Sequence, residues 1–243
     1  MKSFQSGLTL IEVLIAVSLV SLLSTGMLMA LRTGLNAMQK TNSRLMANRR
    51  SLGAQRVIEQ QIAGFMPVMA DCAQAPGAPP TRMPFFQGEP QSMRFVSTYS
   101  LEEANRGLPQ VLEFQVISGA NNQGVRLVVN EHLYVGPRGA GLFCLGIGPD
   151  PVAGTAPHFP PIQPGPRSFV LADRLAGCRF WFRRTLPPPI MERWEDRWVW
   201  REWPTGIRVE MIPLESDPSK VPLVSLAVPL RAQKDPTFQY VTQ

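Results

Sequence analysis

A run of 24 mostly apolar residues, from Leu8 to Leu31, constrains this chain more than any other feature. About 20 apolar residues in a helix span the hydrocarbon core of a bilayer, so the run predicts a transmembrane helix. It carries one charged side chain, Glu12, near its start. An ionisable group at membrane depth is costly and is normally kept for a partner or a function. Glu12 is therefore the first candidate functional residue.

Other kinds of N-terminal segment fit this run less well. A secretory signal peptide has an apolar core of roughly 7–15 residues followed closely by a small-residue cleavage site. This run is longer, lacks such a site, and has no cysteine just after it for lipoprotein processing. A plain membrane anchor remains possible, but it would give no reason for Glu12. Lys2 and Arg32 nearly balance the charge at the two ends, so charge alone does not orient the helix.

The residues around Glu12 resemble a known processing signal. A polar leader ending at Gly7 is followed by Leu8-Thr9-Leu10-Ile11-Glu12. This order is similar to the type IV prepilin signal that pilins and type II secretion pseudopilins share. The resemblance implies that a membrane aspartyl peptidase cuts between Gly7 and Leu8, that Leu8 is then N-methylated, and that the leader lies in the cytoplasm. It also implies an assembly role for Glu12, whose carboxylate would pair with the freed N-terminal amine of a neighbouring subunit.

The helix is expected to continue well beyond the membrane. No proline occurs between Leu8 and Phe65, and Pro67 is expected to end the helix. Past the span, apolar residues recur at nearly heptad spacing, which is typical of an amphipathic helix. We expect this apolar stripe to pack against a sheet. Its members are Leu31, Leu35, Met38, Leu45, Leu52, Ile58, Ile62 and Phe65.

These features predict four segments. Residues 1–7 form the prepilin leader, residues 8–31 the transmembrane part of the helix, residues 32–66 its amphipathic part, and residues 67–243 a β-rich domain. The expected fold is α+β and pilin-like, with the long helix packed on antiparallel β-sheet. The resemblance places the protein in the bacterial inner membrane as a single-pass protein, with its C-terminal domain in the periplasm.

Alternating apolar and polar residues predict strands beyond residue 92. The clearest are Ser92–Tyr99, Val111–Ser118 and Gly124–Val129, with a hairpin connection at Asn121 to Gly124. Residues 70–92, which hold five prolines, and the Gly/Pro-rich residues 136–168 are expected to be loops, the second a long surface excursion.

The C-terminal third carries a second resemblance. A strand over Leu175–Arg183 is followed by a segment with four tryptophans, a proline-led turn into Ile207–Met211, and a closing strand over Leu223–Leu230. This order is similar to that of the J-type minor pseudopilins of type II secretion. Trp203–Ile207 departs from the Leu-Pro-x-x-Val that is usual there.

This resemblance implies a structural subunit at the tip of the type II secretion pseudopilus, which helps to assemble the filament that drives protein export across the outer membrane. Its partners would be other minor and major pseudopilins (I-, K- and H-type siblings), the prepilin peptidase, the inner-membrane assembly platform and the lipid bilayer. The alternative is a minor type IV pilin with an assembly or adhesive role on a surface pilus. Neighbouring secretion genes would favour the first, and pilus-assembly or DNA-uptake genes the second.

Three cysteines would face the oxidising periplasm, so at least one is unpaired. Cys72 and Cys144 lie in segments bordered by proline and glycine, where a bridge would restrain the chain. Cys178 alternates with Phe180 and Phe182 on the apolar face of a strand and suits a buried thiol. We therefore favour a Cys72–Cys144 disulfide.

No motif indicates catalysis, a cofactor or a metal. The chain has no Gly-x-Ser-x-Gly elbow, no His-Glu-x-x-His and no phosphate-binding glycine loop. The carboxylates at Glu102–Glu103 and Glu192–Asp196 stand near arginines, which favours surface salt bridges over acid–base pairs. His132 and His158 lack ligand spacing, and no acidic loop suggests a calcium site. We expect no enzymatic activity and no cofactor.

Two surface properties remain to be assigned. The net charge of +6 is scattered along the chain, so we expect acidic lipid headgroups or acidic partners rather than nucleic acid. The tryptophans of Trp194–Trp203 could form a sugar-stacking platform, but core or interface anchors are the commoner use of such residues.

The first prediction concerns processing. The mature protein should begin at an N-methylated Leu8, and Gly7→Val should block cleavage because the peptidase pocket expects a residue without a side chain. Intact-mass measurement of membrane-extracted protein checks both outcomes. A mature wild-type species that retains Lys2 would contradict the prediction.

Overall fold

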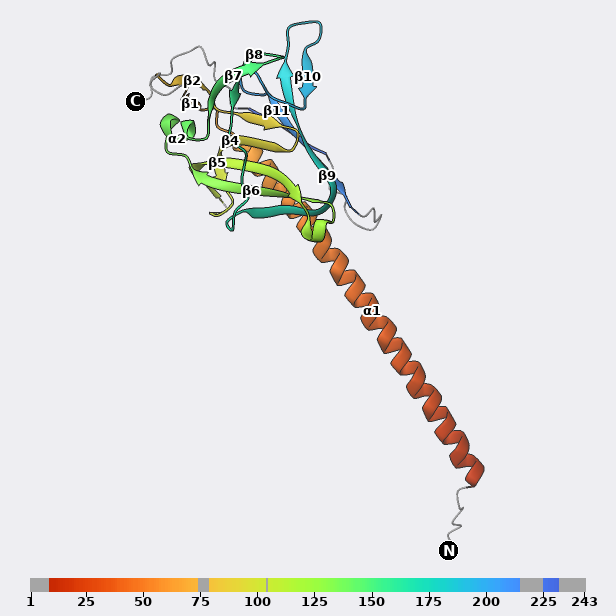
Figure 1. The fold of residues 1–243 in the computed structure, drawn as a ribbon. Helices are drawn as coiled ribbons and strands as arrows, with labels where there is room; N and C mark the ends of the chain where they lie inside the picture. The colour runs from red at the N-terminus through yellow and green to blue at the C-terminus, as the bar shows by residue number, and fades with distance from the viewer. Residues whose placement is uncertain (1–8, 74–78, 104, 215–224, 232–243) are drawn as a thin grey trace, which may run out of the picture. The chain divides into compact units, whose positions relative to one another are not determined.

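The computed structural model describes residues 9–73, 79–103, 105–214 and 225–231. Within these ranges the chain forms one long helix, three antiparallel sheets and two short helical segments (Figure 1). It divides into two compact units, Met1–Arg49 and Arg50–Gln243, each of which is described by itself. A long apolar N-terminal helix followed by antiparallel sheets confirms the predicted α+β architecture and is consistent with a pilin-like fold.

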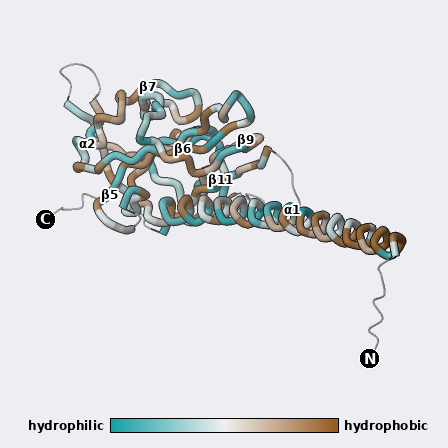
Figure 2. Tube along the Cα trace, turned by 90° about the horizontal axis from the view of Figure 1, so that it is seen from below, coloured by the Kyte–Doolittle hydropathy of each residue, from teal (hydrophilic) through white to brown (hydrophobic). Residues whose placement is uncertain are grey.

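The first unit contains most of helix α1 (Leu10–Ala63). The hydroxyl groups of Ser18, Thr25 and Thr33 each donate to the carbonyl oxygen four residues earlier, at 2.7–2.9 Å. Such bonds satisfy a hydroxyl group where no water is present. The large apolar side chains of this unit are exposed, and the brown stretch of α1 in Figure 2 marks their concentration. By length and composition, α1 could span a membrane.

The second unit is built around an eight-stranded antiparallel sheet. Its strand order is β12-β11-β9-β6-β5-β4-β3, and β10 pairs with β9 beside this path. The long strand β9 pairs first with β6 and then with β11 and β10. The strands are β3 (Gln87–Glu89), β4 (Ser92–Ser100), β5 (Asn105–Ser118), β6 (Val125–Leu133), β9 (Phe169–Thr185), β10 (Glu192–Glu195), β11 (Gly206–Pro213) and β12 (Leu226–Pro229).

The predicted strands are present within the described residues, and Leu223 and Val224 of the closing strand lie outside them. The turn between β5 and β6 contains the short helix η1 (Ala120–Asn122). Residues 70–92 and 136–168 are not plain loops, contrary to the prediction. They contain the hairpins β1 (Met69–Cys72) with β2 (Thr81–Pro84) and β7 (Gly146–Asp150) with β8 (Gly154–His158), besides β3 and helix α2 (Pro137–Gly141). Proline is tolerated in two-stranded sheets because each strand has a free edge, where a missing N–H costs nothing.

One face of the large sheet packs on the end of α1. Ile58, Ile62 and Phe65 share a buried cluster with Phe95 and Phe114. The rings of Phe95 and Phe114 stack with their centroids 5.7 Å apart. This cluster forms the main core of the second unit.

The predicted inward face of β9 is confirmed, because Cys178, Phe180 and Phe182 are all buried in this cluster. The apolar stripe of the helix, in contrast, enters the core only at its end. Burial of α1 begins at Ala54, and the stripe residues up to Leu52 are exposed. At about 1.5 Å per residue the stripe from Leu31 to Phe65 is about 51 Å long, whereas seven strands about 4.8 Å apart span only about 30 Å. A sheet of this width cannot cover the whole stripe.

A second, smaller apolar cluster lies on the opposite face of β4 and β5. There α2 approaches β1 closely, and a Cβ at Gly141 would collide with the carbonyl oxygen of Asp71. Strands β4 and β5 are thus covered on both faces. The cluster consists of Val68, Ala70, Cys72, Met83, Phe85, Val96, Val111, Ala140 and Cys144.

Both edges of the large sheet are blunted. At the β3 edge, the backbone N–H of Trp198 donates to the carbonyl oxygen of Gly88 at 2.8 Å. The other edge strand, β12, has four residues and ends at Pro229, which has no N–H to offer a further strand.

The second prediction tests the main core. Phe114→Ala should lower the free energy of unfolding by about 3–5 kcal/mol, because it removes a fully buried ring and leaves a cavity. Leu108→Ala on the same strand should cost less than about 0.5 kcal/mol, because Leu108 is exposed. Denaturant unfolding of the detergent-solubilised protein, followed by tryptophan fluorescence, measures both. Equal losses for the two variants would contradict the assigned core.

Candidate functional site

Glu12 lies in the first turn of α1, where its backbone N–H donates to the carbonyl oxygen of Thr9 at 3.0 Å. A carboxylate is favourable at this end of a helix, because the first backbone N–H groups have no partner within the helix. The side chain is exposed, as are those of its neighbours Ile11 and Val13. Gly7 and Leu8, the expected cleavage residues, lie outside the described residues.

No residue that the structure describes forms an ion pair with Glu12, and the next charged residue along the sequence is Arg32. A carboxylate among apolar, exposed side chains is costly in hydrocarbon unless a cation or hydrogen-bond donor reaches it. The arrangement therefore leaves a carboxylate at the helix surface that a group from another molecule can approach.

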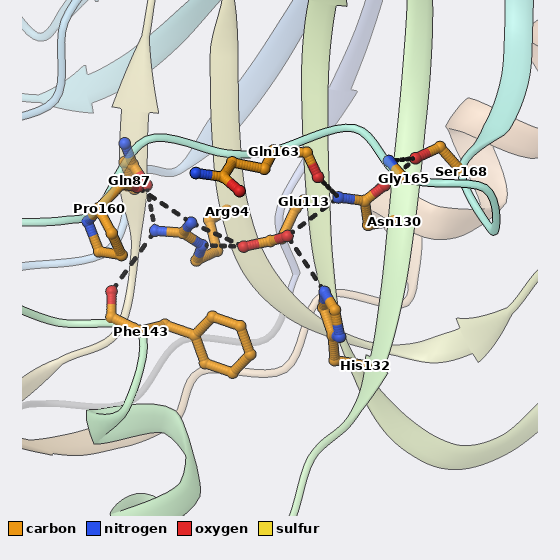
Figure 3. Close-up of polar contacts among 10 residues, drawn as sticks. All are labelled: Gln87, Arg94, Glu113, Asn130, His132, Phe143, Pro160, Gln163, Gly165 and Ser168. Carbon is orange, nitrogen blue, oxygen red and sulfur yellow. Dashed lines mark hydrogen bonds and ion pairs between the residues drawn. The ribbon is translucent and has the colours of Figure 1, made fainter.

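A buried polar network lies on the outer face of the large sheet, the face opposite α1 (Figure 3). Arg94 on β4 donates to Glu113 on β5, with its Nε 2.7 Å from Oε1. The other carboxylate oxygen, Oε2, lies 3.1 Å from Asn130 Nδ2 and 3.1 Å from His132 Nε2, both on β6. The side chains of Arg94 and Glu113 are only 1% and 6% exposed. This is a buried ion pair with hydrogen bonds to both partners.

The ion pair changes the titration of both groups. Burial alone would raise the pKa of Glu113, but the attraction of Arg94 and the hydrogen bonds from Asn130 and Arg94 together hold that pKa below its usual value. Burial lowers the pKa of Arg94, and Glu113 opposes that shift. The Glu113 carboxyl is therefore ionised at neutral pH.

The network holds the segment of residues 136–168, here called the covering segment, on the sheet. Arg94 donates to the carbonyl oxygens of Phe143 and Pro160, and Asn130 donates to that of Gln163. The guanidinium carbon of Arg94 also lies 5.5 Å and 5.6 Å from the ring centroids of Phe143 and Phe159.

The covering segment has two further attachments. Its buried Asp150 pairs with Arg197 at 3.0 Å, and Arg197 also approaches Glu89 on β3 at 3.5 Å. Cys144 is joined to Cys72 of β1 by a disulfide, the pairing that the sequence favoured, with the two Cα atoms 5.4 Å apart. A disulfide that closes a loop of this length stabilises a fold by about 4 kcal/mol.

Cys178 is free and buried, as expected. Burial raises the pKa of its thiol to about 12, so the nucleophilic thiolate form is scarce.

The candidate carboxylates of the β10 region are engaged in pairing. Glu192 lies 3.3 Å from Arg183 and Asp196 lies 3.7 Å from Arg179, while Glu195 accepts a hydrogen bond from the indole of Trp200. These contacts support the salt-bridge interpretation over an acid–base pair.

Two of the tryptophans in this region, Trp198 and Trp203, are buried in the main core. Trp200 packs against the core, and the Trp194 ring lies under the guanidinium of Arg208, 4.1 Å from its carbon to the ring centroid. Burial in the core and packing under an arginine both fit tryptophans that anchor the fold better than tryptophans that bind a sugar by stacking. Within the described residues, no three His, Cys, Asp or Glu side chains group as metal ligands would.

Sequence reasoning missed the buried network. Arg94 and Glu113 stand at alternating strand positions that ordinarily face solvent, and the pattern does not reveal that a distant segment covers them. The only signal was the presence of opposite charges on strands that the sequence predicts to be near neighbours.

Residues 2–28 match the family model described as the prokaryotic N-terminal methylation motif. The matched range includes Gly7, Leu8 and Glu12. The match supports a type IV pilin-like or pseudopilin family, and it implies processing by a prepilin peptidase and assembly with other pilin-like subunits. No curated protein matches the chain.

The third prediction concerns the buried ion pair. Glu113→Gln should lower the free energy of unfolding by about 3–5 kcal/mol, because it leaves Arg94 buried without its counter-charge. Glu192→Gln, which removes a carboxylate that is 55% exposed, should cost less than about 1 kcal/mol.

The same variant has a pH signature. Because the folded-state pKa of Glu113 is lowered, the unfolded state binds the proton first as the pH falls. The stabilisation is fully present above the unfolded-state pKa of about 4.3 and is lost as the pH falls through the folded-state pKa. The difference in unfolding free energy between wild type and Glu113→Gln should therefore be constant near neutral pH and shrink in acid. A difference that grows in acid would contradict this assignment.

Proposed function

We propose that this protein is a minor pseudopilin, a structural subunit at the tip of a type II secretion pseudopilus. The observation that carries the proposal is the methylation motif at residues 2–28, with Glu12 in the first turn of a helix long and apolar enough to span a membrane. Pilin-like proteins with such a motif are structural, and we infer no enzymatic role for this chain.

In this proposal the peptidase removes residues 1–7, and Leu8 becomes the methylated N-terminus. Residues 8–31 hold the protein in the inner membrane until assembly, residues 32–66 continue the helix, and residues 67–243 lie in the periplasm. The Cys72–Cys144 disulfide is consistent with that oxidising compartment. Glu12 then pairs with the N-terminal ammonium of a neighbouring subunit and favours one axial register between the two.

The J-type assignment rests on the C-terminal third. The segments that carry the resemblance are β9, β10, β11 and β12, which are neighbours in the large sheet. The proposed partners are the other pseudopilins of the tip and filament, the prepilin peptidase and the assembly platform.

The fourth prediction tests this role in a strain that lacks the gene. Deletion should abolish export of secreted protein into the medium and leave surface pili intact. Loss of pili with normal export would instead indicate a minor type IV pilin. Complementation with wild type should restore export.

Complementation with Glu12→Gln should restore insertion and Gly7 cleavage, and crosslinking between cysteines placed in the N-terminal helices of this protein and a sibling should fall. We expect a partial loss of export, because a subunit at a filament tip has neighbours on one side. Ser18→Gln places the same carboxamide in the span, keeps Glu12 and should behave like wild type. If Glu12→Gln crosslinks and supports export as well as wild type does, Glu12 does not set the axial register between subunits.

A further inference from the structure

The exposed part of α1 beyond the membrane span has a patterned surface that no described residue covers. Leu31, Leu35, Met38 and Leu45 are 59%, 55%, 72% and 53% exposed. With Asn42 and Arg49 they occupy alternating three- and four-residue steps, and at 100° per residue all six fall within an arc of about 80°. We call this surface the seam. Leu31, Met38 and Leu45 occupy one of its heptad positions, and Leu35, Asn42 and Arg49 occupy the other.

The seam is too long to be covered by lipid headgroups. From Leu31 to Arg49 it extends about 27 Å along the helix, whereas the headgroup layer on one side of a bilayer is about 5–8 Å thick. Lipid headgroups can therefore cover only its first few residues, and the exposed apolar side chains beyond them favour contact with protein. A continuous stripe with heptad spacing fits a second helix, because side chains at these positions interdigitate with those of a facing helix.

The positive charge of Arg49 restricts which helices can cover the seam. It lies within the stripe and is exposed, so a covering helix would bury its guanidinium. A buried cation needs a carboxylate opposite it. The sequence from Val13 to Ile58 contains no Asp or Glu and carries Arg32, Lys40, Arg44, Arg49 and two further arginines. A second copy, parallel and in register, would place Arg49 against Arg49 and offer it no acid.

We propose that the seam docks the N-terminal helix of a different subunit, one that carries an Asp or Glu opposite Arg49 and a hydrogen-bonding side chain opposite Asn42. The parallel arrangement of the two helices rests on the proposed function. Arg49 thus selects the partner in two ways: it attracts an acidic helix and repels a second copy of this chain. Asn42 restricts the axial register, as a polar side chain in a coiled-coil seam does.

In-cell photocrosslinking of the full-length protein tests the proposal. A benzophenone side chain replaces Leu45, and the adduct is identified by mass spectrometry. We expect an adduct with a different chain that carries the same N-terminal motif. Arg49→Glu should reduce it at least tenfold, and Arg49→Lys should keep it within about twofold. Lys40→Glu makes the same charge reversal on the opposite side of the helix, about 180° from Leu31, and should have less than a twofold effect. As a control, the amount of each variant protein and its cleavage after Gly7 are measured to show that it inserts normally.

Two variants give the reciprocal evidence. Changing the partner's opposing carboxylate to Arg should restore the adduct of Arg49→Glu. Arg49→Leu removes the repulsion between copies and should increase the adduct with a second copy at least fivefold.

The outcomes separate this inference from the proposed function. If wild type forms no adduct with another motif-bearing chain, both fail. If that adduct forms but Arg49→Glu leaves it unchanged, or Arg49→Leu gains no self-adduct, the seam is not a charge-selective dock while the pseudopilin role stands. A wild-type adduct only with a second copy would overturn the inference as well.

Discussion

Exposed apolar surface on α1 is the constraint on which the rest of the molecule depends. From Leu10 through Leu45 the large apolar side chains of this helix contact solvent in the isolated chain. Water disfavours apolar surface of this extent, which marks it as a surface for lipid or for protein contact. Hydrocarbon can cover residues 10–31, but it cannot satisfy Glu12 there, and it does not extend along the seam past Leu31. Under the proposed function, lipid covers one part of this helix and other subunits cover the rest.

The second unit must be stable without help from the exposed part of this helix. Strands β4 and β5 of its large sheet are covered on both faces, by the buried end of α1 and by the covering segment with β1–β2. Its edges offer little to another strand, because Trp198 closes one and Pro229 ends the other. Association through sheet edges is thereby disfavoured, and the exposed face of α1 offers a continuous apolar surface for association.

The sequence predicts the features that depend on local pattern and misses those that depend on what covers a face. Alternation is local, so it identifies β9 and the inward position of Phe180. The pairing of Cys72 with Cys144 could be favoured because the third cysteine belonged to an apolar strand face. The same alternation shows that Glu113 points outward, but not that the covering segment buries it. The sequence predicted that Leu45 packs against the sheet, but this residue is exposed. An apolar stripe shows that a surface needs a partner, but it does not show that the partner lies in the same chain.

The buried ion pair has a physical reason in the covering segment itself. Between Phe159 and Pro164 this segment contains three prolines, which have no N–H and cannot join a strand ladder, yet its carbonyl oxygens still require donors. Arg94 and Asn130 supply those donors from the sheet. Apolar pairs often replace buried ion pairs without loss of stability. Here an apolar pair would leave carbonyl oxygens of the covering segment without hydrogen-bond donors, and it would also remove the attraction between the charges. Glu113 is therefore needed chiefly to keep the guanidinium of Arg94 buried, ionised and aimed at the segment that it holds.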